Sequence, residues 1–403
     1  MVLVMKHRGS VCREEKHITF EEQVAMGNVL SVYDPLFYAQ EGLIALEKAL
    51  GMAGRVYRGY DKSPQQKGSV ISISIPSTFA AQDAPSTAQD IKTGEVQIAL
   101  NFWREVKFAL TDKELTFTTE KIINDHIRPA AYALADDIDQ KLAALYKLFP
   151  FYVVATGPAA VADITASRTV LFNNKVPMDD LHMMLNGTLE GEFLNLAAFS
   201  QASGAGDAGV QTQMRGTLGQ KFGFEVFANQ NVNTHTGGAC ADPDGAIANA
   251  PGYAAGTKTI NVDGLTAAGT VKVGDVLEIT GHTQKYVITE DATANAGAIT
   301  LKIEPGLQLA VTNAQVVKVI VGNFSESIGF HRNAIALAMA PLTEAGNNLG
   351  ARISTITDPI TGLALRSRIW YEGDDSTIKV ALDVLYGMKV LNCNMGVRLR
   401  DAA

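Results

Sequence analysis

The sequence predicts an α+β protein that carries an additional small all-β domain, and three observations support this. Residues 118–149 have the apolar spacing of a long α-helix. Residues 69–76 and 95–117 alternate apolar and polar side chains, as half-buried strands do. Residues 236–322 are rich in Gly, Ala, Thr and Asp and have turn signals about every eight to twelve residues. The 403 residues allow two or three domains at roughly 100–200 residues each.

Residues 1–63 are expected to form an extended N-terminal arm. Helical apolar spacing occurs in two short pieces, Glu22–Leu30 and Gly42–Leu50, and Pro35 lies between them. Such a segment has little core of its own, so it must pack on its own body or on a neighbour.

Residues 64–117 are expected to form an extended hairpin loop. The outgoing strand is Ser69–Pro76, the polar stretch Ser77–Asp90 is its loose tip, and Glu95–Phe117 is the return. A hairpin of this length is marginal in isolation, so it needs a partner surface.

The long helix opens the next region, residues 118–235. Thr118 or Thr119 is a plausible cap, Pro129 should kink or split the helix, and Pro150 follows its end. The rest of this region predicts helices at Ala159–Phe172 and Glu190–Phe199, strands at Leu181–Leu185 and Leu218–Asn229, and a glycine-rich loop at Ser200–Gly209.

Residues 236–322 are read as an all-β domain inserted into the α/β parent, with linker-like flanks at Gly237–Gly238 and Gly322–Asn323. Its expected strands are Lys258–Val262, Asp275–Ile279, Lys285–Thr289, Ala298–Ile303 and Gln315–Val321. Residues 323–403 then resume the parent, with a helix at Gly329–Met339 and strands at Arg352–Thr357, Leu363–Tyr371, Thr377–Leu385 and Met388–Leu399.

Composition excludes several classes of protein. The net charge of -8 argues against general wrapping of nucleic acid, which needs clustered Lys and Arg. The three cysteines, Cys12, Cys240 and Cys393, form no CxxC pair, so a disulfide framework or zinc ribbon is not expected. The N-terminus lacks the pattern of a secretory signal. The sequence contains no uninterrupted stretch of about 18 apolar residues, so no membrane partner is expected.

Two local motifs fail on context. Gly204–Gly209 matches GxGxxG, but a helix precedes it and no clear helix follows, so we read a flexible surface loop. Asp242–Gly245 resembles the start of a calcium loop, but the twelfth position is Tyr253 instead of Glu, so a simple turn is expected.

The titratable residues do not form a predicted site. His235 and Cys240 have no second His/Cys pair, and His182 and His331 stand alone on apolar segments as structural histidines. Two acidic groups are expected to be solvated or intersubunit-bridging rather than convergent: Asp136, Asp137 and Asp139 on the long helix, and Glu372, Asp374 and Asp375 in a turn. We therefore assign no catalytic, cofactor-binding or metal-binding residue and expect no enzyme.

Large aromatic residues on strands leave two readings open. Trp103-Arg104 and Trp370-Tyr371 can pack in the core, or they can anchor an interface, where aromatic residues and Arg dominate the binding energy. The sequence gives these readings equal weight.

The order of elements, an arm, a long hairpin, a long helix, a mixed domain with a β insertion and a strand-rich end, resembles the capsid fold of tailed bacteriophages. Encapsulin shells and the herpesvirus capsid floor share this fold. The likeness covers the chain from about residue 20 onward and looks like the coat-protein branch with an extra β-domain. The stretches that carry it are Arg128–Asp139, Gly219–Asn231, Ile328–Ala338 and Ile369 through Val397.

The resemblance implies a major capsid protein that self-assembles from hexamers and pentamers into an icosahedral shell around the phage genome. Residues 118–149 would be the spine helix, the hairpin would lie over a neighbouring subunit, the arm would reach another, and an axial domain would gather around the five-fold and six-fold axes. Scaffolding, portal and decoration proteins are further partners that it implies, with non-specific contact to packaged double-stranded DNA. It places the chain in the virion capsid, assembled in the host cytoplasm. Some relatives cross-link through a Lys–Asn isopeptide bond, but nothing marks Lys67 or Lys92 as that lysine.

Three alternatives stay open. An encapsulin-type bacterial compartment has the same fold, although the β insertion favours a phage. A mixed α/β enzyme would need a converging catalytic set. A tail or decoration protein is usually all-β, which the long helix opposes.

Overall fold

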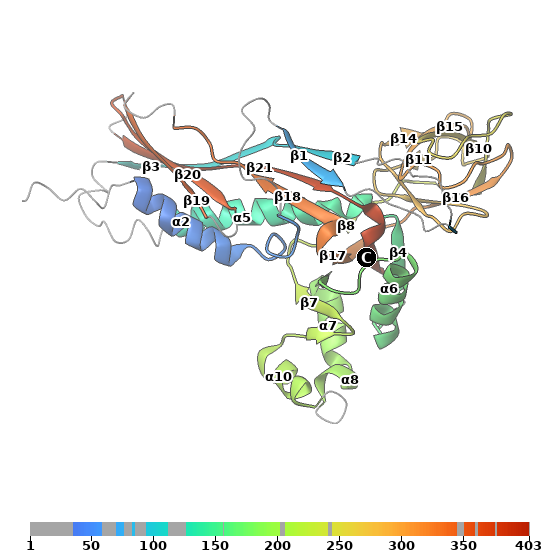
Figure 1. Cartoon of the computed structure of the whole chain (residues 1–403), viewed down its shortest axis with the longest axis horizontal. Coiled ribbons are helices and arrows are strands. Elements are labelled where there is room, and N and C mark those ends of the chain that lie inside the picture. Colours follow the sequence, from blue (N-terminus) through green and yellow to red (C-terminus); the bar gives the residue numbers. More distant parts are fainter. Residues whose placement is uncertain are drawn as a thin grey trace, which may run out of the picture.

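The computed structural model describes residues 35–58, 70–75, 83–84, 94–111, 126–155, 157–201, 206–240, 244–344, 350–358, 362–374 and 377–402. Three parts meet near the middle of the molecule: a sheet backed by two helices, a lobe below it, and a β-barrel at one side (Figure 1). Helices and strands mix throughout the first two parts, so the predicted α+β class is confirmed.

The first part is a five-stranded antiparallel sheet built around one long strand. Strand β21 (Thr377–Val390) pairs with β3 (Phe102–Thr111) on one side and with β20 (Ala364–Glu372) and then β18 (Ile335–Met339) on the other, and β19 (Ala351–Thr357) pairs with β20. Helices α2 (Pro35–Ala49) and α5 (Arg128–Ala143) pack on one face of this sheet. Their buried side chains, among them Leu46, Leu134, Ile138, Leu365 and Leu382, form one hydrophobic core with it.

Two elements of the C-terminal region differ from the prediction. The expected helix Gly329–Met339 is wrong: the end of β17 (Phe324–His331), a short 3-10 turn and β18 occupy it. The expected strand Met388–Leu399 is also wrong, because β21 runs on to Val390 and β22 (Gly396–Ala402) starts anew. Both strands of the first segment are buried on both faces, and a continuous apolar run does not distinguish a buried strand from a buried helix.

Helix α5 spans Arg128–Ala143, within the predicted range 118–149, and Pro129 does not lie in its interior. Pro129 lies in its first turn, where its missing N–H has no intrahelical partner to lose. The helix continues into a 3-10 turn, η3 (Ala144–Leu148), just before Pro150. The candidate caps Thr118 and Thr119 lie outside the described residues.

Asp139 on α5 is buried, so the expectation of a solvated or bridging carboxylate is wrong for it. Its side chain is only 4% exposed and accepts the backbone N–H groups of Gly51 (2.7 Å), Met52 (3.2 Å) and Ala53 (3.3 Å). Burial raises the pKa of Asp139, and the three backbone donors act in the opposite direction. The carboxylate thereby holds the turn after α2 against α5, which helical periodicity alone does not reveal.

The lower lobe is built on a seven-stranded mixed sheet. Its order is β4 (Phe151–Ala155), β22, β17, β5 (Leu181–Leu185), β7 (Phe224–Ala228) and β6 (Gly219–Lys221), with β8 (Thr234–His235) beside the start of β17. The helices described in this lobe are α6 (Val161–Asn173), α7 (Gly187–Asn195), α8 (Ala197–Ser200) and α10 (Asp207–Arg215). Its core is a cluster of its own that includes Met183, Leu189, Phe193 and Phe224.

Most predicted elements of the lobe are confirmed, with local differences. The strand Leu181–Leu185 is found with its predicted bounds, and the helix Ala159–Phe172 is shifted by one or two residues. The predicted helix Glu190–Phe199 is divided near Leu196 into α7 and α8. The predicted strand Leu218–Asn229 is a hairpin of β6 and β7, because a turn at Phe222-Gly223 reverses the chain.

The third part is a closed six-stranded barrel, which the turn spacing did not predict as closed. The barrel strands are β9 (Asp244–Ile247), β10 (Thr259–Asp263), β12 (Val276–Ile279), β13 (Tyr286–Ile288), β15 (Ile299–Glu304) and β16 (Val316–Ile320). Five of them match the predicted strands within about two residues, and β9 was missed. A separate hydrophobic core fills the barrel, with Ile260, Leu277, Tyr286 and Leu301 fully buried.

The glycines at the base of the barrel, which were expected to form loose linkers, are instead closely packed. A Cβ atom on Gly237 would lie 2.4 Å from the backbone nitrogen of Gly322, and one on Gly238 would lie 2.0 Å from the carbonyl oxygen of Thr270. Such distances exclude any larger side chain without movement of the backbone. The two connections between barrel and lobe therefore run side by side.

Replacing Asp139 tests how strongly this carboxylate holds the turn after α2. We expect Asp139→Ala to lower the free energy of unfolding by about 3 kcal/mol or more, because buried backbone donors lose their acceptor. Asp139→Asn, which keeps one acceptor oxygen, should lose less. Urea unfolding of the soluble chain measures both. Asp136→Ala, at an exposed position of the same helix, is the control and should change the value by less than about 0.5 kcal/mol.

Candidate functional surfaces

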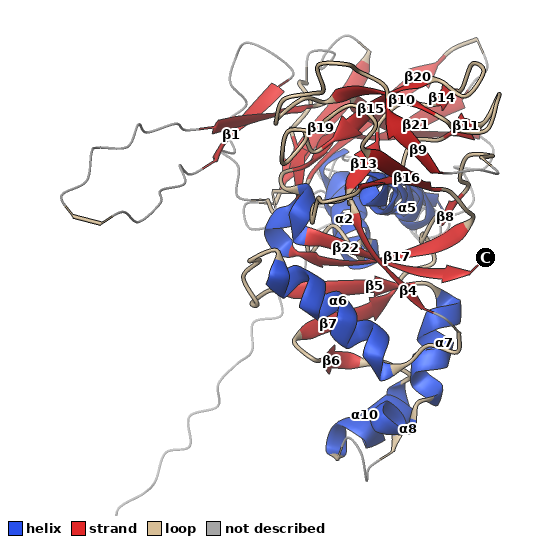
Figure 2. Cartoon of the chain, turned by 90° about the vertical axis from the view of Figure 1, so that its right-hand side faces the viewer, coloured by secondary structure: helices blue, strands red, loops and turns tan. Residues whose placement is uncertain are grey.

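A two-stranded ribbon projects from the body of the molecule (Figure 2). Strands β1 (Val70–Ile75) and β2 (Gly94–Ala99) pair antiparallel over six residues each, from Val70–Ala99 at the base to Ile75–Gly94 at the outer end. At about 3.4 Å per residue the paired part spans roughly 20 Å. The predicted two-stranded excursion is thus found, although its return strand is interrupted at Leu100-Asn101 and continues as β3 in the sheet.

The ribbon is fixed at its base. Ile98 and Leu100 are buried against Ala336 and Ala338 on β18 and against Ala340 just after it. Lys389 Nζ on β21 donates to the carbonyl oxygen of Gln97, 3.1 Å away.

A close backbone approach completes this base. A Cβ atom on Gly387 would lie 2.2 Å from the carbonyl oxygen of Ala99, so a larger residue cannot stand at this position. Farther out, Val96 is half-buried, while Ser72 and Glu95 are exposed. The ribbon is therefore held in a set direction at its base, while Ser72 and Glu95 gain little burial from the described body.

The face of the five-stranded sheet that points away from α2 and α5, called the open face below, carries a charge network centred on a buried carboxylate. Asp383 on β21 is fully buried and accepts from Arg366 Nε (3.0 Å) and from Arg368 Nη2 (3.1 Å). Arg368 also lies 3.0 Å from Glu105 on β3. Arginines bound in this way are held in one orientation on the sheet.

Aromatic rings flank these arginines. The Arg366 guanidinium lies 5.9 Å from the centre of the Trp103 ring, and that of Arg368 lies 5.7 Å from the Trp370 ring. Trp103 is 58% exposed and Tyr371 is 53% exposed, so for these two the core-packing reading is wrong. Exposed aromatic rings beside fixed arginines are the composition of an interface hot spot.

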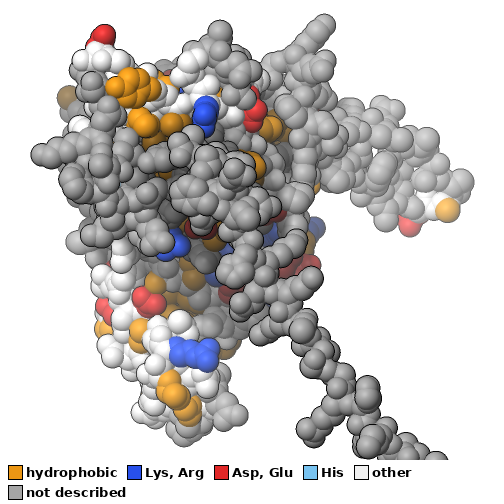
Figure 3. Space-filling view, turned by 90° about the vertical axis from the view of Figure 1, so that its left-hand side faces the viewer, with side chains coloured by type: hydrophobic (Ala, Val, Ile, Leu, Met, Phe, Trp, Pro, Cys, Tyr) orange, Lys and Arg blue, Asp and Glu red, His pale blue; other side chains and the backbone are white. Residues whose placement is uncertain are grey.

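The tip of the lower lobe exposes a second group of apolar side chains. Val210 and Met214 on α10 are exposed, Met214 to 75%, and Phe222 is exposed in the turn between β6 and β7. Figure 3 shows hydrophobic side chains at the surface of the lower lobe. Phe222 has a φ of +49°, a conformation that bulky residues rarely adopt, and Arg168 Nη1 holds its carbonyl oxygen at 2.6 Å.

His182 links the lobe to the turn after α2. Its Nδ1 lies 3.0 Å from Glu225 Oε2, and Arg55 from that turn binds Glu225 Oε1 at 2.7 Å. Burial lowers the pKa of His182, and the nearby Glu225 acts in the opposite direction. His331 also has a structural partner, since its Nδ1 accepts the backbone N–H of Asn333. Both histidines are structural, as predicted.

His235 is likewise structural. It is buried between the Tyr146 hydroxyl (3.1 Å) and Asp275 Oδ1 (2.9 Å), whereas Cys240 lies in the barrel core. Across the described ranges, no three His, Cys, Asp or Glu side chains gather as a metal site would require.

The remaining sequence motifs are scattered. Helix α10 begins inside the GxGxxG match, at Asp207, so the expectation of no clear helix there is wrong. The element described before the match is α8 and not a strand. Asp137 binds the Tyr386 hydroxyl at 2.5 Å, Asp136 binds the Asn231 amide at 2.7 Å, and Glu372 pairs with Lys379, so these carboxylates do not converge. Asp242, Asp375, Lys67 and Lys92 lie outside the described residues.

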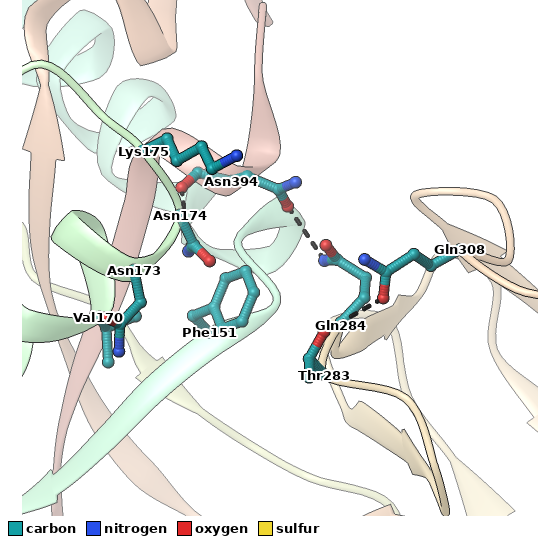
Figure 4. A pocket seen from close by; sticks show the side chains of 9 residues that line it. All are labelled: Phe151, Val170, Asn173, Asn174, Lys175, Thr283, Gln284, Gln308 and Asn394. Carbon is teal, nitrogen blue, oxygen red and sulfur yellow. Dashed lines mark hydrogen bonds between the residues drawn. The ribbon is translucent and has the colours of Figure 1, made fainter.

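A cavity of about 590 Å³ lies between the lobe and the barrel (Figure 4). Its lining residues are Phe151, Val170, Asn173, Asn174, Lys175, Thr283, Gln284, Gln308 and Asn394. Gln284 Nε2 in the barrel donates to Asn394 Oδ1 in the lobe at 3.0 Å. Within the lobe, Asn174 Nδ2 donates to the Asn394 carbonyl oxygen at 3.3 Å. Side-chain hydrogen bonds thus join the lobe and the barrel at this cavity, and its lining residues include no nucleophile in contact with a base.

Within the described part of the chain, no helix is both long and apolar enough to cross a bilayer.

No model of a known protein family matches the sequence, and no curated protein matches it. Solved structures with a similar fold do exist. One from Mycobacterium phage Che8 is 14% identical, covers 87% of this chain and 90% of its own, and has a TM-score of 0.48. The capsid of cyanophage P-SCSP1u is 12% identical over 83% of this chain and 84% of its own, with a TM-score of 0.43. A virus-like particle from Pyrococcus furiosus is 9% identical, covers 90% of this chain and 97% of its own, and has a TM-score of 0.38.

Several of the similar structures are bacteriophage capsids.

The buried His182 predicts a pH dependence of stability. Because its pKa is lower in the folded chain than the unfolded value of about 6.5, the folded state binds this proton less tightly. The stability contribution is present above about pH 6.5 and is lost as the pH falls through the folded pKa. Urea midpoints measured from neutral to acidic pH should fall less steeply for His182→Gln than for the natural chain. His126→Gln, at an exposed position, should keep the natural slope.

Proposed function

We propose that this chain is the major capsid protein of a tailed bacteriophage, a structural subunit whose work is to associate with copies of itself into a shell. The observation that carries the proposal is the β1–β2 ribbon. It is anchored at Ile98 and Leu100 and directed away from the body, so a neighbouring surface must supply the burial that its own chain does not. No converging catalytic set among the described residues competes with this role.

The parts of the molecule fit the roles that the resemblance implies. We assign α5 and η3 to the spine helix, the ribbon to the extended loop over a neighbour, and the tip of the lower lobe to the contacts around symmetry axes. The barrel would be the inserted β-domain, with boundaries near residues 236 and 322. The expected arm of residues 1–63 is only partly free for this role, because residues 35–58 form α2 and the turn after it and pack in the core of their own subunit. In this proposal the contact with another neighbour belongs to residues 1–34, which lie outside the described part.

Burial of the ribbon and sheet surfaces supplies the free energy of assembly in this proposal. Burial of apolar surface contributes about 25 cal/mol per Å². If each subunit buries a few thousand Å², this free energy exceeds the entropy cost of fixing one copy in the shell. The exposed Trp103 beside Arg366, and Val210 and Met214 on α10, are side chains from which such interfaces are built. The net charge of -8 limits DNA to non-specific contact.

The remaining features of the proposal follow from a shell role. Scaffolding, portal and decoration proteins would be partners, the virion capsid the final location, and the host cytoplasm the place of assembly. The barrel favours the phage branch over an encapsulin-type compartment, as the sequence already indicated.

Removing the hairpin tip separates folding from assembly. Deletion of residues 77–90, most of which lie outside the described part, should leave a folded monomer with an unchanged thermal midpoint. The deleted chain should fail to form closed shells, because the contact over the neighbour is lost. Negative-stain microscopy and sedimentation of the purified chain measure this. Closed particles of normal size from the deletion would contradict the role of the ribbon.

Trp103→Ala tests the open face of the sheet. Because Trp103 is largely exposed, the free energy of unfolding of the monomer should change by less than about 1 kcal/mol. If Trp103 is an interface anchor, the concentration needed for assembly should rise about tenfold or more, as expected for an interface loss above ~1.4 kcal/mol. Light scattering during assembly measures this concentration. The matched control is Leu309→Ala, at a similarly exposed barrel position; equal behaviour of both variants would remove Trp103 from the interface.

A further inference from the structure

The end of α5, the lobe sheet and the barrel meet at one buried polar junction. Arg398 and Arg400 on β22 and Glu326 on β17 are fully buried there, with Arg400 Nε 3.0 Å from Glu326 Oε1. Buried charges are costly unless they are paired, so a cluster of this kind fixes the geometry of whatever it binds.

Arg398 binds both sides of the junction with one guanidinium. Its Nε donates to the carbonyl oxygen of Phe149 (2.6 Å) and its Nη2 to that of Lys147 (3.3 Å), both at the end of η3. Its Nη1 donates to the carbonyl oxygen of Gly274 in the barrel (2.7 Å). Burial lowers the pKa of Arg398 to about 10, and Glu326 acts in the opposite direction, so the group stays charged at neutral pH.

A second link runs in parallel through side chains. The Tyr146 hydroxyl on η3 meets His235 Nδ1, and His235 Nε2 meets Asp275 Oδ1 in the barrel. The other oxygen, Asp275 Oδ2, accepts the backbone N–H groups of Gly238 (3.0 Å) and Lys272 (2.7 Å). Tyr146, His235 and Asp275 are each at most 2% exposed, so water does not compete for these bonds.

Steric contact closes the same junction. Gly274 has a φ of +103°, and a Cβ atom placed on it would lie 3.1 Å from both Lys147 Cγ and His235 Cε1. The barrel turn therefore fits directly against η3, and neither can shift without moving the other.

We infer that η3 and the barrel form one mechanically coupled unit, in which a change at the end of α5 is passed to the barrel through Tyr146–His235–Asp275 and through Arg398. A 3-10 turn at the end of a long helix is a place where such a change in winding is accommodated. The coupling is a property of the single chain and goes beyond the proposed shell role.

Hydrogen exchange on the full-length monomer tests the coupling. Tyr146→Phe removes one hydroxyl on the η3 side and touches no barrel atom. The amides of Gly238 and Lys272, which Asp275 holds, should then exchange about fivefold faster, the effect of losing roughly one net hydrogen bond. The control is Tyr152→Phe, which removes another lobe–barrel bond, to Glu278 (3.0 Å), outside η3. It should leave both amides within about twofold of the natural chain, because the junction is intact.

A double-mutant cycle gives a second measure. Tyr146→Phe and Asp275→Asn should have less than additive effects on unfolding, because both interrupt the same path. Unchanged exchange at Gly238 and Lys272 in Tyr146→Phe would overturn the inference, as would an equal rise in the Tyr152→Phe control or strictly additive effects in the cycle. These outcomes concern the monomer and do not depend on whether shells form.

Discussion

The arrangement of the molecule depends on the continuity of β21. Over 14 residues this strand pairs with β3 along one side and with β20 and β18 along the other, and its other neighbours include the helix α5 and the root of the ribbon. Its inward side chains, such as Val380 and Leu382, contribute to the core with α2 and α5, while Asp383 faces the opposite side and orients two arginines. A break in this strand would separate the ribbon from the sheet and both from the helices.

Gly387 shows how closely β21 and the ribbon are matched. Only a residue without a side chain permits the carbonyl oxygen of Ala99 to come so near, and the direction of the ribbon follows from that approach. The proposed intersubunit contact is thus set by the interior of the subunit. A rigid root lowers the entropy cost of ordering the ribbon when it meets a neighbour.

Sequence patterns predicted those elements whose burial is one-sided. The spacing from Ile127 to Leu142 gives α5, and the alternation after Val70 gives β1, because in both cases one face is apolar and the other is not. The patterns failed where burial is two-sided, as at Gly329–Met339. They also failed for Asp139, whose partners Gly51 to Ala53 are 86 to 88 residues away in the chain. Contacts at such separation leave no local signal.

The candidate surfaces were only partly predictable, for the same reason. From the sequence, Trp103 could be a core or an interface residue, and its exposure in the structure rules out the core. The exposed turn at Phe222 could not be predicted, because phenylalanine is not a turn-forming residue. Its left-handed backbone follows from the hairpin and from the contact with Arg168. The Arg398 junction was missed, since three separate segments supply its partners.

The pairing of β8 with β17 determines where the chain can change in length without a change of the sheet. His235 lies opposite Phe324, so the polypeptide leaves the lobe and re-enters it on adjacent antiparallel strands, as the two arms of an ordinary hairpin would. A hairpin turn at this point can lengthen by gradual increments, up to a whole barrel, while the strand order of the sheet beneath stays the same. The length of the chain between His235 and Phe324 is therefore not constrained by the sheet that these two residues join.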